Sequence, residues 1–277
     1  MSMHPICITC GTQFAESDAA PERCPICEDE RQFVGWAGQG WTTLEALRAH
    51  HRLTLKDEGD GLLGIGCEPR FAIGQRALLV PAGARAGAGG NVLWDCISLI
   101  DGAAARVVQA QGGLAAIAIS HPHYYSSMVE WSRAFDGAPI YLHADERRWV
   151  MRPDPAIVFW EGERLEIGEG LTLLRLGGHF AGAQVLHWAG GAAGRGALLA
   201  GDILQVVPDR HFVSFMYSYP NYVPLSAATV RRIAATLEPY PFERIYGAWF
   251  DAVVREDAKA AVRRSAERYL RALETDR

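Results

Sequence analysis

Two histidines separated by one residue, His121 and His123, follow an apolar segment of strand length at residues 115–119. Pro122 lies between them and keeps the chain extended, because the residue before a proline is pushed out of the helical region. Both imidazoles can therefore point into one cavity. Neutral imidazole is a common ligand of divalent metals, so the pair predicts a metal site.

Two further residues of ligand type follow other strand-like segments. His179 comes after two glycines that end residues 171–176, and Asp202 comes after Gly201, which ends residues 197–200. Catalytic zinc commonly takes three protein ligands and leaves a fourth position for water. A single histidine is more typical of a hydrogen-bonded core residue, but three histidines and an aspartate that all follow strand ends favour a metal site. The expected set is His121, His123, His179 and Asp202.

These side chains need strands that end at one edge and turns that follow. Ser127 and Glu130 have capping-box spacing ahead of a helix at residues 129–135, which places the histidine pair between a strand end and a helix N-terminus. Strands are also expected at residues 77–80, 91–94, 139–143, 157–165, 171–176, 184–188, 197–200 and 244–246. Helices are expected after caps at Thr42 and Ser226, at residues 144–150, and over a C-terminal stripe at residues 262–273. This order predicts an α/β (α+β) protein with two packed sheets and helices outside.

Four cysteines near the N-terminus form two C-x-x-C pairs separated by thirteen residues, typical of a zinc ribbon or knuckle. We expect Cys7, Cys10, Cys24 and Cys27 to bind one structural Zn²⁺, because a closed four-thiolate site leaves no position for chemistry. A thioredoxin-like role is disfavoured, since polar turns flank the pairs. The surrounding acidic residues disfavour nucleic acid. The ribbon is interpreted as a structural staple or a surface for protein docking.

Composition limits the partners. The chain has 277 residues, a formal net charge of −5 and 49% hydrophobic residues, which predicts neither a nucleic-acid nor a membrane partner. The N-terminus lacks a basic segment followed by an apolar one, so a soluble cytoplasmic protein is expected. We expect a ribbon at residues 1–34, a linker with a short helix at 35–65 and a main domain at 66–277. Residues 81–90 are interpreted as a flexible connection between two strands.

The main domain resembles the metallo-β-lactamase superfamily. That family has a four-layer αββα fold with an H-x-H-x-D-H loop, a later histidine after glycine, an aspartate in a Gly-Asp step and a final histidine. The matching residues are His121, His123, His179 and Asp202. The resemblance covers about residues 66–277 and implies the αββα sandwich. The N-terminal ribbon lies outside it.

Three positions depart from the family pattern. Tyr125 and Ser126 stand where the loop has its aspartate and second histidine, and residues 247–250 offer no final ligand. In dinuclear members these positions build the second metal site, so we expect one ion here, Zn²⁺ or another divalent metal such as iron. Trp249 and Phe250 are expected to line the cavity in place of the missing ligand.

The expected chemistry is hydrolysis of a small-molecule carbonyl substrate, an ester, lactone, thioester or amide. A divalent metal can lower the pKa of a bound water from about 15.7 toward 7. Asp202 is the expected base or water-orienting group, and Tyr125 or Ser126 is a candidate contact to substrate, although a serine here can equally cap the helix. The aromatic segment at residues 208–222 is a candidate lid over the site.

Other assignments remain open. His143 and His211 are spare ligand candidates, and Cys67 and Cys96 are interpreted as buried small hydrophobes. The main alternative function is a catalytically silent member that keeps the fold and a metal as a binding or scaffold protein. An iron-dependent oxidative enzyme is compatible with two histidines and a carboxylate. A nuclease is disfavoured because two-metal phosphoryl chemistry needs the missing ligands.

Overall fold

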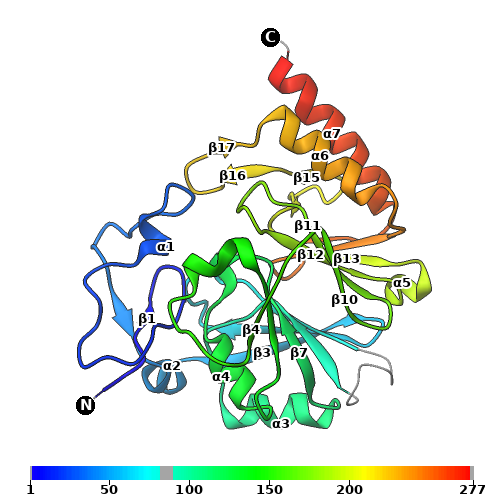
Figure 1. The fold of residues 1–277 in the computed structure, drawn as a ribbon. Helices are drawn as coiled ribbons and strands as arrows, with labels where there is room; N and C mark the ends of the chain where they lie inside the picture. Colours follow the sequence, from blue (N-terminus) through cyan, green and yellow to red (C-terminus); the bar gives the residue numbers. More distant parts are fainter. Residues whose placement is uncertain (1, 82–89, 275–277) are drawn as a thin grey trace.

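Two β-sheets packed face to face form the centre of the protein (Figure 1). The computed structural model describes residues 2–81 and 90–274, so most of the predicted connection at residues 81–90 lies outside the described residues. The first sheet contains, in spatial order, β3 (Arg52–Gly59), β4 (Leu62–Glu68), β5 (Ala77–Val80), β6 (Asn91–Trp94), β7 (Leu114–Ala118), β8 (Ile140–His143) and β9 (Ile157–Trp160). Strands β3 to β6 pair antiparallel, and β6 to β9 pair parallel.

The second sheet has six strands. Its spatial order is β10 (Arg164–Gly168), β11 (Leu171–Arg175), β12 (Gln184–Trp188), β13 (Ala197–Gly201), β18 (Arg244–Gly247) and β19 (Val253–Val254). Only β13 and β18 pair parallel in this sheet. Smaller pairs are formed by β1 (Ile6–Cys7) with β2 (Trp41–Thr42), β14 (Gln205–Val206) with β15 (Val213–Ser214), and β16 (Met216–Ser218) with β17 (Val223–Pro224).

Alternating apolar residues explain why both faces of each sheet are covered. Leu78 and Val80 of β5 belong to the apolar layer between the sheets, whereas Leu79 belongs to the cluster that includes the helices. The same alternation separates Leu199 from Leu198 in β13. Successive strand side chains point to opposite faces, so strands buried on both sides require helices outside the two sheets.

The helices form the two outer layers. Figure 1 shows α3 (Gly102–Ala110) and α4 (Met128–Arg133) on one side of the molecule, and α6 (Ala227–Leu237) beside α7 (Ala258–Glu274) on the other. Shorter helices are α1 (Pro25–Glu28), α2 (Leu44–His50) and α5 (Gly191–Gly194), with 3-10 helices at Pro122–Tyr124 and Ala144–Trp149. The predicted αββα sandwich is therefore confirmed.

Several predicted elements need correction. Residues 157–165 do not form one strand, because Gly162 has a φ of +96° and lies where the chain passes from β9 in one sheet to β10 in the other. Thr43, not Thr42, caps α2 through its side chain, since Thr42 belongs to β2. Helix α3, which Asp101 caps, is not among the predicted helices. The segment at residues 144–150 is a 3-10 helix.

The N-terminal segment packs tightly on the sandwich. Its cysteines belong to the same continuous apolar cluster as the core of the main domain, and the amide of Gln13 donates to the carbonyl of Ser126 at 3.0 Å. Strand β3 and the first part of β4 fall within the predicted linker at residues 35–65, yet both strands belong to the first sheet. The sheet thus begins at Arg52 rather than near Gly66. Within the described residues, no helix combines the length and apolarity needed to cross a membrane.

Candidate metal centre

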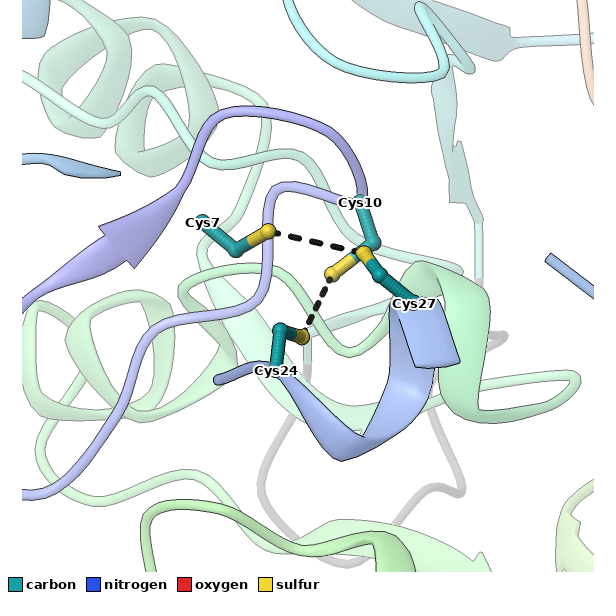
Figure 2. A group of neighbouring side chains, drawn as sticks. All are labelled: Cys7, Cys10, Cys24 and Cys27. Atoms are coloured by element: carbon teal, nitrogen blue, oxygen red, sulfur yellow. Dashed lines mark hydrogen bonds between the residues drawn. The ribbon is translucent and has the colours of Figure 1, made fainter. Parts of the chain in front are cut away.

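The four N-terminal cysteines converge as their spacing predicts (Figure 2). The sulfurs of Cys7 and Cys27 are 3.5 Å apart, and those of Cys10 and Cys24 are 3.7 Å apart. Four thiolates on one zinc ion, each about 2.3 Å from it, would be about 3.8 Å from one another. All four cysteines are buried and none forms a disulfide, so the group fits a structural zinc site.

The three predicted histidines also meet in one place. His121, His123 and His179 are each at most 3% exposed, and one ligand atom from each lies within 4.8 Å of the others. His121 follows β7, His123 lies in the 3-10 helix after it, and His179 lies between β11 and β12. Strand ends from both sheets therefore supply the ligands.

Distances between polar atoms test whether these side chains fit a metal ion. Nε2 of His179 lies 3.3 Å from Nδ1 of His123, and Nε2 of His121 lies 3.3 Å from Oδ1 of Asp202. Two ligands of a tetrahedral zinc ion, each about 2.0–2.1 Å from it, would be about 3.3 Å apart. Nε2 of His121 and Oδ1 of Asp202 have no hydrogen-bond partner although both are buried. A bound cation would satisfy them, because an unpaired buried polar atom is costly.

Hydrogen bonds on the far side of two rings fix which nitrogen faces the site. Nδ1 of His121 lies 2.9 Å from the hydroxyl of Ser120, and Nδ1 of His179 lies 2.7 Å from the carbonyl oxygen of Tyr217. A carbonyl only accepts, so Nδ1 of His179 donates and Nε2 keeps a free lone pair. Such outer partners are typical of histidines that bind metals.

Burial sets the charge of the site. It lowers the pKa of His121 and His123 well below the usual value, and the neighbouring His179 lowers both further. Burial also lowers the pKa of His179 and raises that of Asp202. Neutral imidazoles are the form that binds a metal, so the three rings are ready to act as ligands near neutral pH.

The Gly-Asp step brings Asp202 to the histidines. Gly201 ends β13 with a φ of +56°, a conformation that glycine adopts without strain. A Cβ on Gly201 would lie 2.8 Å from the hydroxyl of Ser120, which orients His121. Below Ser120, Oδ1 of Asp95 accepts its amide at 2.8 Å, and burial raises the pKa of Asp95 to about 7.

The tyrosine beside Asp202 is Tyr124, which the sequence analysis did not select. The Tyr124 ring lies 4.5 Å from the His121 ring, and Asp202 raises the pKa of its buried phenol in addition to the effect of burial. Tyr125 is also fully buried, and neither tyrosine lines the cavity beside the histidines. Tyr124 belongs to a tight 3-10 turn. The loop sequence does not reveal in which direction each side chain of such a turn points, so it cannot distinguish Tyr124 from the neighbouring Tyr125.

The predicted capping box is wrong. The Ser127 side chain makes no capping hydrogen bond to α4, and Glu130 pairs instead with Arg152 at 2.5 Å. Ser126 does not cap the helix either, because its hydroxyl accepts from Gln75 at 3.0 Å. Ser126 therefore serves a buried contact with a neighbouring segment, whereas the buried hydroxyl of Ser127 has no hydrogen-bond partner among the described residues.

An open cavity of about 320 Å³ adjoins the histidine cluster. Its walls include His123, His179, Asp202, Thr9, Arg31, Gln32, Phe33, Arg70, Ala72, Ile73, Tyr219, Pro220 and Trp249. Trp249 lines it as predicted, but Phe250 does not, since it packs against Gly64 and Gly66. Part of the predicted lid, Tyr219 and Pro220, reaches the cavity.

The remaining candidates lie elsewhere. His143 is satisfied by hydrogen bonds, with Nε2 3.1 Å from the carbonyl oxygen of Gly162 and Nδ1 accepting from the amide of Asp145 at 3.2 Å. His211 is exposed and does not line the cavity. Cys96 is fully buried, but Cys67 is only half-buried, and its burial raises the pKa of the thiol to about 11.

Comparison with solved structures identifies the fold. The DIM-1 metallo-β-lactamase is 12% identical, with a TM-score of 0.59 over 80% of this chain and 98% of that one. The metallo-β-lactamase FIM-1 from Pseudomonas aeruginosa, in its mono-zinc form, is 15% identical, with a TM-score of 0.54 over 78% and 95%. The metallo-β-lactamase from Hirschia baltica is 15% identical, with a TM-score of 0.54 over 78% of this chain and 97% of that one. The chain therefore has the metallo-β-lactamase fold, with a cysteine knuckle added at its N-terminus.

Sequence comparison then places the chain among closer relatives. No protein-family model matches the sequence. The uncharacterized protein YmaE of Bacillus subtilis (strain 168) is 51% identical over 273 residues, which cover 98% of this chain and 97% of that protein. The chain belongs to the same family as YmaE. The aligned residues extend over the N-terminal segment as well as the sandwich.

Proposed function

We propose that the protein is a hydrolase that uses one divalent metal ion, Zn²⁺ or another such as iron, held by His121, His123 and His179. The observation that carries this proposal is the convergence of three imidazoles and a carboxylate beside an open cavity, with 3.3 Å between neighbouring ligand atoms. When bound, the ion would supply Lewis acidity toward water and toward a carbonyl oxygen. FIM-1, described above in its mono-zinc form, has the same fold.

The chain's own residues would do the positioning. Asp202 lies at the cavity wall and would accept a proton from the attacking water or orient that water toward the carbonyl. Tyr124, whose ring lies 4.5 Å from that of His121 and whose buried phenol is near Asp202, would help to keep the carboxylate in place. Tyr125, the tyrosine selected from the sequence, would support the core of the loop and not contact the substrate.

The cavity favours a small carbonyl substrate with an apolar body. Phe33, Ile73 and Trp249 contribute apolar surface, while Arg70 brings a guanidinium that donates to the carbonyl of Ile73 at 2.6 Å. Arg70 forms no ion pair within the described residues, so an anionic group on the substrate would find a partner there. Esters, lactones, thioesters and amides are the reaction class proposed.

The alternative function is a catalytically silent metal-binding protein. The position of Asp202 favours it, since a carboxylate completing a tetrahedral shell leaves no room for water, as in structural zinc sites. We place the protein in the cytoplasm, because four reduced thiolates are stable ligands in a reducing compartment. Neither nucleic acid nor a membrane is proposed as a partner.

Metal content tests the centre. We expect two ions per chain in the wild type and one in His123→Ala, because the remaining two imidazoles bind weakly while the cysteine site is unchanged. Elemental analysis after gel filtration measures both, and His211→Ala, outside the cavity, is the control. Two ions in His123→Ala would contradict the assignment.

Hydrolysis of ester, lactone and thioester probes tests the activity. Asp202→Asn keeps the size of the side chain but removes the base, and we expect about 100-fold or more loss of kcat/KM. Equal rates in the wild type and Asp202→Asn on every probe, with two ions bound in both, would favour the silent alternative.

A further inference from the structure

The cysteine knuckle forms one wall of the cavity beside the histidines. Thr9, Arg31, Gln32 and Phe33, all from the N-terminal segment, line the same cavity as His179. Figure 1 shows this blue segment, with α1, lying beside β16 and β17. If the N-terminal segment were only a separate docking module, the cavity would be complete without residues from it.

Arg31 makes the most direct connection. Its side chain is buried, its Nε and Nη2 pair with the Asp29 carboxylate at 2.5 and 2.8 Å, and its Nη1 donates to the carbonyl oxygen of His179 at 3.3 Å. The Asp29 carboxylate offsets the positive charge, which would otherwise oppose a cation at the histidines. One planar guanidinium therefore joins the knuckle to a metal ligand.

The same guanidinium covers the aromatic ring beneath the histidines. The Arg31 carbon Cζ lies 3.9 Å from the centre of the Phe180 ring. That ring contacts all three imidazoles, with ring centres 4.9 to 5.5 Å apart. Movement of Arg31 would release Phe180, and with it the packing that holds the imidazoles together.

A second connection runs through the lid. Tyr217 accepts the Nδ1–H of His179 with its carbonyl oxygen, and its hydroxyl donates to Glu30. Nδ2 of Asn221 donates to the carbonyl oxygens of Glu30 and Gln32 at 2.9 and 3.1 Å. Both the backbone and the ring of His179 are thus held by contacts to residues 30–32.

From these contacts we infer that the four-cysteine knuckle belongs to the histidine metal centre, with Arg31 as the residue that positions His179. Glu30 and Arg31 follow Cys27 by three and four residues, so zinc at the cysteines fixes the backbone that carries them. The inference deepens the proposed function, because it makes metal affinity at the histidines depend on the knuckle. It does not require that the reaction be hydrolysis.

Metal affinity is the direct readout. Arg31→Met removes the guanidinium and keeps an unbranched apolar side chain. Arg152→Met is the matched control, because Arg152 is also buried and also joins the N-terminal segment to the main domain, through Gln13 and Glu130. Arg152 does not line the histidine cavity. Each protein is stripped of its second ion and titrated with Zn²⁺ against a chelator, with Co²⁺ spectra separating thiolate from imidazole binding.

We expect Arg31→Met to bind Zn²⁺ at the histidines about 10- to 100-fold more weakly while keeping one ion at the cysteines. Arg152→Met should stay within about twofold of the wild type. Arg31→Lys, which keeps the charge but not the planar fork, should also lose affinity and serves if Arg31→Met does not fold. Wild-type affinity in the folded Arg31 variants, or an equal loss in Arg152→Met, would overturn the inference. If the wild type hydrolyses none of the probes while Arg31→Met still binds Zn²⁺ more weakly at the histidines, the proposed hydrolase function is wrong but the role of Arg31 stands.

Discussion

Two of the three imidazoles in this centre, those of His121 and His179, are directed by a hydrogen-bond partner on their far side. Ser120 holds Nδ1 of His121, and the backbone of Tyr217 holds Nδ1 of His179, so both rings present Nε2 to the same point. Ser120 is in turn confined by Gly201, which leaves space for its hydroxyl. The glycine before Asp202 thus supports a histidine in the other sheet.

A methyl group at Gly201 tests this arrangement. In Gly201→Ala the Cβ would displace the Ser120 hydroxyl, and we expect about tenfold weaker metal binding at the histidines. Gly137→Ala is the control, because Gly137 also has a positive φ, +76°, but a Cβ there meets nothing within 4 Å. Both variants should lose about 1–2 kcal/mol of stability from backbone strain. Chelator competition that shows equal metal affinity in both would argue against Ser120 as the orienting group.

The strands below the site are joined by a buried ion pair. Arg76, just before β5, pairs with Glu58 of β3 at 2.5 Å, and both side chains are at most 2% exposed. Arg76 also donates to the carbonyl of Gly247 at 3.2 Å, at the end of β18 in the second sheet. Arg76 therefore holds the end of β18, where the resemblance to the metallo-β-lactamase superfamily would place a final histidine.

Neutralising one partner should reveal how much this element depends on the pair. We expect Glu58→Gln to lower the free energy of unfolding by about 3 kcal/mol, because Arg76 would remain charged without a buried counterion. Glu274→Gln is the matched control: its pair with Arg231 is 55% exposed on both sides, so the change should be under about 1 kcal/mol. Urea unfolding measures both. Equal midpoints for Glu58→Gln and the wild type would show that Arg76 needs no carboxylate.

Glu146 connects parts of the whole molecule that are distant in sequence. It lies in the 3-10 helix after the first sheet's β8, is 2% exposed, and accepts the amide of Gly182 from the loop that follows His179. Burial raises its pKa from 4.5 to about 7, and Asp145 adds to this effect while Arg31 and Arg148 oppose it. The folded protein therefore holds a proton on Glu146 at pH values where the unfolded chain does not.

The sign of the pH effect follows from linkage. The proton on Glu146 stabilises the fold fully below about pH 4.5, and this stabilisation is lost as the pH rises through about 7. A pKa of about 7 against 4.5 corresponds to a free energy on the order of 3 kcal/mol. Glu146→Gln, which still accepts from Gly182, should therefore be more stable than the wild type at pH 8 and nearly equal at pH 5. Urea unfolding at pH 5 and pH 8 measures both proteins. The same difference in free energy of unfolding between Glu146→Gln and the wild type at both pH values would refute this prediction.

The sequence by itself determined which cysteines and histidines come together, and most of the strands. Residue type and spacing are sufficient for Cys7 with Cys10, because a C-x-x-C turn brings two thiolates together locally. Alternating apolar residues are likewise sufficient for a strand such as β13, since burial on a sheet face has a period of two. For these features the determining interactions lie within a few residues of one another.

Only the tertiary structure decided how these pieces meet. The nearness of Tyr124 to Asp202, the pairing of Glu130 with Arg152, and the contact between Arg31 and the carbonyl of His179 depend on segments far apart in the chain. Such contacts leave no local periodicity, because their geometry is fixed by how two sheets and the knuckle pack. For that reason the cysteine pairs indicated a zinc site, but only the folded chain places the segment that carries them against the cavity beside the histidines.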